Sequence, residues 1–388
     1  MPIVEDIADL CVDATLWRRD FHAHPELLYE VHRTAGIVAA QLESFGCDEV
    51  VTGIGRTGVV GVIRGRASGD NNKIIGMRAD MDALPITEVT GVSYQSVIVG
   101  KMHACGHDGH TAMLLGAARY LAETRNFSGT AVLIFQPAEE GGAGAKAMLD
   151  DGLVERFGIQ EVYGMHNLPG LALGQFGLRA GPAMASADLF SIDIQGLGGH
   201  AAWPHITVDP LLVGSHIVTL CQSIVARNVD PLEGAVVSVT MFKAGDAINV
   251  IPDSVQLQGT ARSLSSGTRE FLHKRMKEIV EGTAQLHGAK ATLTWKPLYP
   301  VTFNHAEQAA FAASVAREVV GDANVTTDLA PMMSTEDFAF LLEARPGAYI
   351  FLGNGASAGW HHPAYNFDDQ AIPLGTSYWI RLAERALA

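Results

Sequence analysis

The stretch HTAMLLGAARYLAETRNFSGTAVLIF, residues 110 to 135, joins the two kinds of element that decide the fold class. Its first part, 110–123, has the apolar spacing of a helix. Its end, 131–135, is a short continuous apolar run, typical of a strand that is covered on both faces. Similar runs occur at 58–63 and 74–77. Strands that alternate with helices in this way predict an α/β fold with a mostly parallel central sheet.

The chain outside this stretch predicts a second, smaller domain. The opening segment up to about Phe45 has a helical pattern. From about Ala185 the order becomes strand, helix, strand, strand, helix, strand, at 189–194, 210–226, 236–242, 255–262, 268–287 and 291–295. This order is typical of a ferredoxin-like α+β domain. Helices at 307–318 and 336–342 and a strand at 348–352 then resume the α/β pattern. We therefore expect a catalytic domain formed by 1–184 and 296–388, with an inserted domain at 185–295.

Composition excludes several classes of protein. The chain has 388 residues, more than a single core usually holds, and is 48% hydrophobic and 18% charged, as globular proteins are. Its net charge of -15 argues against a nucleic-acid or anionic-membrane partner. Acids at Glu5, Asp6 and Asp9 argue against a secretory leader, and no apolar run approaches the roughly 20 residues of a membrane span. Four cysteines without disulfide spacing favour a reducing cytoplasm.

Acids, histidines and a cysteine gather where the predicted strands end. The carboxyl ends of parallel strands line one crevice of an open sheet, where ligands bind. The residues that follow strands, or that precede the helix at 110–123, are Asp80, Asp82, Cys105, His107, Glu139, Glu140, His166, His361 and His362. So many potential ligands at one edge predict a metal site.

The residue types suit metal-dependent hydrolysis. Cys105 and His107 offer a thiolate and an imidazole from one turn, which a borderline cation such as Zn²⁺ accepts. A lone Cys-x-His would more often be a core cysteine and a loop histidine, and a lone acid pair would more often be solvated. Of the adjacent Glu139 and Glu140, one can bind metal while the other serves as a general base. Such a set can hold two ions about 3.5–4 Å apart.

Several segments, in this order, resemble the M20 metallopeptidase family and its amidohydrolase branch. They are DFHAHPEL (20–27), GMRADMDALP (76–85), GKMHACGHDGHTAMLLGAA (100–118), FQPAEEGGAGA (135–145), GMHNLP (164–169) and WHHPAYNFDD (360–369). The resemblance covers essentially the whole chain. It implies a zinc-peptidase-like catalytic domain with an inserted dimerisation domain, also called the lid.

The resemblance also implies roles for individual residues. Two divalent ions would be held by five ligands, with Cys105 as the bridge, and Mn²⁺, Zn²⁺, Co²⁺ or Ni²⁺ would suit the site. The full ligand set implied is Cys105, His107, Glu140, His166 and His362. Glu139 would activate the bridging water, and Asp82 would orient a ligand without touching metal. The wider family has His-x-Asp where this chain has Asp80-Met81-Asp82. Whether Asp80 contacts metal or caps a turn stays open.

The inserted domain carries three further residues that the resemblance singles out. His200, on the Gly-rich loop GLGGH, would donate a hydrogen bond to the oxyanion, in its own or in a partner subunit's site. Asn249 and Arg262 would hold the substrate's α-carboxylate, which fits a guanidinium fork. His205 is expected to be structural. The same domain would form a homodimer or homotetramer.

The expected activity is hydrolysis of N-acyl-L-amino acids to a carboxylate and a free amino acid by Glu139-assisted attack of water. A dipeptidase or carboxypeptidase acting on small peptides is the alternative within the same class. A metal-stabilised scaffold without activity is a third possibility, which the extra acid Glu139 disfavours. No GxSxG motif indicates a serine nucleophile.

Overall fold

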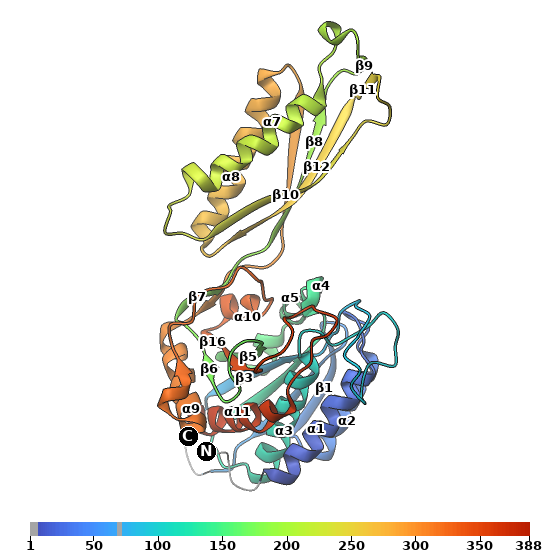
Figure 1. Cartoon of the computed structure of the whole chain (residues 1–388). Coiled ribbons are helices and arrows are strands. Elements are labelled where there is room, and N and C mark those ends of the chain that lie inside the picture. The colour runs from blue at the N-terminus through green and yellow to red at the C-terminus, as the bar shows by residue number, and fades with distance from the viewer. Residues whose placement is uncertain (1–6, 68–71) are drawn as a thin grey trace. The chain divides into compact units, whose positions relative to one another are not determined.

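A computed structural model describes residues 7–67 and 72–388, so the acids at positions 5 and 6 lie outside the described residues. The chain forms two compact units (Figure 1). The first is built from residues up to 183, from 303–330 and from 337–388, and the second from 184–302 and 331–336. The return of 331–336 to the second unit is fixed by backbone hydrogen bonds from the Ala185 N–H to the carbonyls of Met332 and Ser334, both at 3.0 Å.

The first unit is organised around an eight-stranded sheet. Its strands lie in the order β1 (Glu49–Ile54), β2 (Gly58–Arg64), β4 (Thr130–Gln136), β3 (Ile74–Asp80), β5 (Glu161–Leu168), β16 (Gly347–Gly353), β6 (Phe176–Gly177) and β15 (Val325–Thr326). The four central strands, β4, β3, β5 and β16, are mutually parallel. On one side, β2 pairs antiparallel with both β4 and β1. On the other side, β6 pairs antiparallel with β16 and parallel with β15. The predicted α/β class with a mostly parallel sheet is confirmed.

Both faces of the sheet are buried, as the continuous apolar runs predict. In β4, Ala131, Leu133 and Phe135 belong to one core cluster, while Val132 and Ile134 are equally buried on the other face. The first core also contains residues of α1 (Ala8–Ala23), α2 (His32–Ser44), α3 (His107–Thr124), α9 (Ala306–Val320) and α11 (Ile372–Ala386). Shorter helices are α4 (Glu139–Gly142), α5 (Gly144–Asp150), α6 (Leu153–Phe157) and α10 (Ala339–Ala344).

Several predicted boundaries are wrong in ways that affect the site. Strands β3 and β5 continue through Asp80 and His166, because both strands stay hydrogen-bonded to neighbours that extend as far. Helix α3 begins at His107 rather than near residue 110. The helix predicted at 336–342 is α10, at 339–344, whereas the opening segment is helical as predicted and forms α1 and α2. Strand β1 and helix α11 were not predicted.

The second unit has the predicted ferredoxin-like order. It contains β8 (Asp188–Gln195), α7 (Pro210–Ser223), β10 (Ala235–Ala244), β12 (Ser254–Ser263), α8 (Ser266–Leu286) and β13 (Lys290–Pro297). The antiparallel sheet order is β10-β12-β8-β13, and α7 and α8 contribute to one core with it. A short ladder of β9 (Gly199–His200) with β11 (Val250–Ile251) extends beyond the β8–β12 pair. The carboxylate of Asp209 caps α7, and the hydroxyl of Ser265 caps α8.

Helix α7 is unusually apolar. Together with the π-helical turn that follows, Pro210–Asn228 is, among the described residues, the one helical stretch whose length and hydropathy would allow it to cross a membrane. Its Val213, Ile217 and Cys221 pack in the core of the second unit. Leu211, Leu212 and Leu220 are exposed on the same helix. Core helices of water-soluble proteins have the same length and hydropathy, so this stretch is weak evidence for a membrane span.

Candidate metal centre

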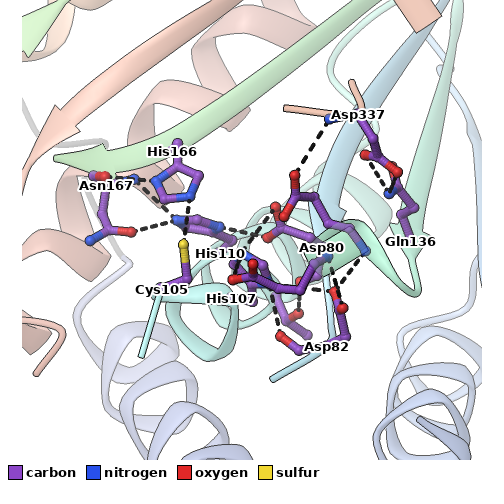
Figure 2. Close-up of polar contacts among 12 residues, drawn as sticks. Asp80, Asp82, Cys105, His107, His110, Gln136, His166, Asn167 and Asp337 are labelled. Carbon is purple, nitrogen blue, oxygen red and sulfur yellow. Dashed lines mark hydrogen bonds and ion pairs between the residues drawn. The ribbon is translucent and has the colours of Figure 1, made fainter. Parts of the chain in front are cut away.

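The candidate ligands meet at the carboxyl edge of the parallel strands in the first unit. Asp80 ends β3 beside Gln136, which ends β4, and His166 lies near the end of β5. Cys105 and His107 stand at the start of α3, where Figure 2 shows them near His166. Glu140 lies in α4, so different elements deliver these residues to this edge. The predicted gathering of these side chains is therefore what the fold produces.

Three groups of residues that could hold a metal ion overlap, because each shares a residue with another group. One potential ligand atom from each of Cys105, His107 and His166 lies within 4.8 Å of the others, and the same holds for Cys105, Glu140 and His361, and for His107, Glu139 and Glu140. The Cys105 sulfur is 3.4 Å from His166 Nε2, and Glu140 Oε1 is 4.0 Å from His107 Nε2. Overlapping groups of this kind suit two neighbouring ions with a shared ligand.

Backbone contacts orient both histidine rings towards the cluster. Nδ1 of His107 lies 2.8 Å from the carbonyl of Asp82, and Nδ1 of His166 lies 2.7 Å from the carbonyl of Asn167. Because a carbonyl only accepts, each Nδ1 carries a proton, and Nε2 is the ring atom that can bind a metal. His107 Nε2 is buried without a hydrogen-bond partner among the described residues, 4.0 Å from Glu140 Oε1. An unsatisfied buried nitrogen beside a carboxylate fits a site for a cation.

The neighbouring charges fit the same conclusion. Burial lowers the pKa of His107, but the carboxylates of Asp80, Asp82 and Glu140 outweigh it and raise that pKa to about 10. Burial, with the nearby ring of His110, holds the pKa of His166 well below its usual value. Without an ion, a proton on His107 thus compensates the buried acids, and metal binding would displace it.

The structure brings His361, rather than the predicted His362, to the cluster. Nε2 of His361 is 3.3 Å from Glu140 Oε1. Its backbone has φ 62° and its N–H donates to the Ala104 carbonyl at 2.8 Å, which fixes the residue beside Cys105. Both histidines are exposed, but His362 Nδ1 accepts from the Ala364 N–H at 3.0 Å and belongs to no ligand group among the described residues. The left-handed backbone at His361 is what distinguishes the two neighbouring residues.

Asp82 holds the backbone that carries Glu139 and Glu140. Its two carboxylate oxygens accept from the backbone N–H groups of Glu139 and Glu140, at 2.9 and 3.1 Å. The loop it holds is strained: Ala138 and Ala143 on either side of α4 have φ values of 55° and 56°. Such backbone persists only where surrounding bonds determine it.

Asp80 has both oxygens engaged with other side chains. Oδ2 is 2.7 Å from Arg78 Nη1, and Oδ1 is 2.6 Å from His110 Nδ1. Its Oδ2 lies 3.7 Å from His107 Nε2. These two short bonds favour a supporting role for Asp80, although its proximity to two histidines satisfies the geometry of a ligand group as well.

A buried network behind Glu139 was missed by the sequence analysis. Glu139 is 7% exposed, and its Oε1 lies 3.4 Å from the backbone N of Asp337. The Asp337 carboxylate accepts from Arg78 Nη2 at 2.9 Å and from Gln136 Nε2 at 2.8 Å. An arginine inside an apolar strand is a signal that could have revealed this network, since a buried guanidinium needs acidic partners.

The three residues singled out in the second unit do not lie together. His200 is in β9, and the carbonyl of Asn249, just before β11, accepts from the Ala201 N–H at 3.0 Å. Arg262 is at the far end of β12, where its Nη1 donates to the Ala261 carbonyl at 2.9 Å. Since β11 lies beyond Ser254, the first residue of β12, roughly 25 Å of extended strand separates Asn249 from Arg262. One copy of the chain therefore cannot place both on one small carboxylate.

A mostly buried set of thiol, imidazole and carboxylate groups that could hold metal is typical of metal-dependent hydrolases. The model of peptidase family M20/M25/M40 matches residues 76–385, and the chain belongs to this family.

Similar proteins agree over nearly the full length. A hippurate hydrolase of Campylobacter jejuni is 42% identical, covering 100% of both chains. An N-acetylcysteine deacetylase of Bacillus subtilis is 39% identical over 94% of each chain. The solved structure of Bacillus subtilis YXEP protein, described as a dinuclear metal-binding peptidase of the M20 family, has a TM-score of 0.86 and 34% identity, covering 98% of this chain and 99% of that one. The chain is thus a metal-dependent amidohydrolase of the M20 family's amidohydrolase branch.

Proposed function

We propose that the protein hydrolyses N-acyl-L-amino acids, hippurate-like or N-acetylated, to a carboxylate and a free amino acid, with two divalent ions bound. The observation that carries the proposal is the buried Glu139 carboxylate, which lies within 4.8 Å of His107 and Glu140 and is held by the backbone of Asp337. Relatives named for hippurate and N-acetylcysteine hydrolysis support the substrate class.

The proposed centre uses Cys105, His107, Glu140, His166 and His361 as ligands. His361 replaces His362 in this set because its ring lies beside Glu140. When bound, the two ions polarise the acyl carbonyl and lower the pKa of a water molecule. Zn²⁺ and Mn²⁺ both suit a mixed sulfur, nitrogen and oxygen set, with Co²⁺ and Ni²⁺ as further candidates.

Glu139 carries the proton in the proposed reaction. Its carboxylate accepts a proton from the attacking water, whose oxygen bonds to the acyl carbon. The C–N bond then breaks, and Glu139 returns the proton to the amine nitrogen of the leaving amino acid. The N–H of Asp337, held by the network of Arg78 and Gln136, keeps the Glu139 carboxylate in place.

The decisive experiment replaces Glu139 with Gln, which keeps the side chain's size and removes its basicity. We expect metal content to be unchanged and the turnover of benzoyl- and acetyl-amino acids to fall by about 10²–10⁴-fold. Unchanged hydrolysis with metal retained would refute the mechanism.

A peptidase acting on free dipeptides is the second candidate, because the similar Bacillus subtilis YXEP protein is described as a peptidase. A panel of acetyl- and benzoyl-amino acids and of dipeptides, compared by kcat/KM with the same metal-loaded protein, separates the two. Preference for dipeptides would contradict the N-acyl assignment.

The second unit is proposed to act between copies of the chain. Arg262 would bind the α-carboxylate, while His200 and Asn249 would serve the site of a partner subunit, because they lie too far from Arg262 to share its ligand. The exposed leucines of α7, Leu211, Leu212 and Leu220, would contact that partner in a homodimer or homotetramer.

Mixing inactive variants tests this arrangement. Glu139→Gln and His200→Ala subunits, unfolded and refolded together, would form mixed dimers in which one site has both residues intact. We expect about a quarter of the activity of the unmodified protein to return if dimers form at random. No recovery would mean that His200 acts in its own subunit.

A further inference from the structure

Four buried side chains of the first unit form a hydrogen-bonded chain behind the candidate ligands. They are Asp80, His110, Asn167 and Tyr365, and each is at most 1% exposed. Figure 2 shows the first three, with His110 between Asp80 and Asn167. Neither the ligand set nor the proposed mechanism uses His110, Asn167 or Tyr365.

The hydrogen bonds link the four side chains in order. Nδ1 of His110 lies 2.6 Å from Asp80 Oδ1, and the backbone N–H of Asn167 donates to His110 Nε2 at 3.0 Å. The side-chain Oδ1 of Asn167 lies 2.9 Å from the same Nε2, and its Nδ2 donates to the Tyr365 hydroxyl at 2.5 Å.

His110, Asn167 and Tyr365 each belong to a segment that carries a candidate ligand. His110 is one turn after His107 on α3, and Asn167 follows His166 on β5. Tyr365 is four residues after His361, and its backbone N–H donates to the His362 carbonyl at 2.9 Å. The Asn167 carbonyl contacts His166 Nδ1 at 2.7 Å and accepts from Trp360 Nε1 at 3.2 Å. The chain therefore joins the segments of three histidine ligands.

The turn between Cys105 and His107 packs directly on this hydrogen-bonded chain of side chains. Gly106 has φ 103°, and a Cβ built there would lie 2.2 Å from Asn167 Oδ1 and 2.6 Å from the Tyr365 hydroxyl. Only glycine fits such an approach. The position of the Cys105 turn is thus tied to Asn167 and Tyr365.

We propose that Asp80, His110, Asn167 and Tyr365 form a positioning chain that sets how tightly the centre holds its metal ions. The chain keeps α3, β5 and the His361 segment in register, so loss of one link lets the ligands separate. The inference rests on the proposed function only through its metal centre and is independent of the substrate.

Tyr365→Phe tests the far end of the chain by removing a single hydroxyl. Tyr163→Phe is the matched control, since Tyr163 is also buried and donates to Glu161 at 2.9 Å at the other end of β5. Zn²⁺ affinity of the full-length proteins is measured by competition with a chromogenic chelator. We expect Tyr365→Phe to weaken binding by on the order of 10-fold and Tyr163→Phe to leave it unchanged.

Unfolding of the metal-free and zinc-loaded proteins separates positioning from general stability. A merely structural hydroxyl would lower both midpoints equally. The proposal expects Tyr365→Phe to lose part of the additional stability that Zn²⁺ confers, while Tyr163→Phe retains it. Zn²⁺ affinity of Tyr365→Phe equal to that of the unmodified protein would overturn the proposal. No zinc binding by the unmodified protein would refute the metal centre itself, and the inference with it.

A double-mutant cycle tests whether the links act as one. His110→Asn keeps an N–H for Asp80 but breaks the connection to Asn167. If the chain is a unit, the double variant with Tyr365→Phe binds Zn²⁺ about as weakly as the weaker single variant. If the fold-losses in Zn²⁺ affinity of the two single variants multiply in the double variant, the two contacts act independently. That result would contradict the proposal that the four side chains act as a unit. If His110→Asn does not fold, the two tyrosine variants decide alone.

Discussion

Two clusters of histidines and carboxylates flank the start of α3, and they differ in how their ring nitrogens are used. In the closed cluster, His22 has Nδ1 2.8 Å from Asp108 Oδ2 and Nε2 3.1 Å from Glu88 Oε1. In the open cluster, His107 and His166 place Nδ1 on backbone carbonyls and keep Nε2 for the ligand group. Asp108 and His107 are neighbours in sequence, yet they belong to different clusters.

The difference shows that residue types alone do not define a metal site. A histidine between two carboxylates is already compensated: burial lowers the pKa of His22, but Asp108 and Glu88 outweigh it and raise that pKa to about 9. In the open cluster, His107 Nε2 has no hydrogen-bond partner among the described residues, and the carboxylates of Asp80 and Glu140 lie 3.7 and 4.0 Å from it. A cation can replace the proton on this nitrogen, whereas both ring nitrogens of His22 are already hydrogen-bonded.

The largest effect should come from breaking the open cluster at His361. We expect His361→Ala to lose at least one ion and to reduce kcat by about 10³-fold or more, because the ion both polarises the carbonyl and activates water. His362→Ala is the neighbouring control and should retain metal and activity. Metal analysis and hydrolysis of benzoylglycine check both, and the reverse order of effects would restore His362 as the ligand.

A smaller effect is expected from Asp82→Asn, which removes one acceptor for the loop of Glu139 and Glu140. Loss of such a supporting contact usually lowers metal affinity or activity by about 10–100-fold. Glu88→Gln, a charge-removing change of the same kind in the closed cluster, should leave Zn²⁺ affinity unchanged. Equal losses of affinity in the two variants would remove the distinction between the clusters.

The smallest effect concerns stability and pH in the closed cluster. The folded pKa of His22, about 9, lies above its ordinary value of 6.5. Its stabilising contribution is therefore fully present below pH 6.5 and is lost as the pH rises through 9, by on the order of 3 kcal/mol. Denaturant unfolding of the metal-free protein across this range should show a decline that His22→Gln reduces. The rest of the decline comes from His107, whose pKa of about 10 is also raised above its ordinary value. An identical decline in both proteins would assign it to other groups.

Much of the site could be predicted because apolar strands and polar ends have distinct patterns. Clear apolar strand or helix patterns lie next to four of the site residues, namely Cys105, His107, Glu139 and Glu140. The parallel sheet then brings these segments to one edge. The exact strand ends could not be predicted, since Asp80 is polar yet paired with Gln136 inside the sheet.

Other features depend on contacts that no local pattern contains. The choice between His361 and His362 depends on one left-handed backbone angle. Asp337 reaches Gln136 across 201 residues of sequence. Asn249 and Arg262 were assigned together from resemblance, but only the register of β12 with β8 reveals that they lie at opposite ends of a sheet.

The most direct test of the account is anomalous diffraction from crystals of the unmodified protein loaded with Zn²⁺. The account predicts two ions among Cys105, His107, Glu140, His166 and His361, with Glu139 coordinating neither, and no ion between His22, Glu88 and Asp108. An ion in the closed cluster, or none in the open one, would contradict it.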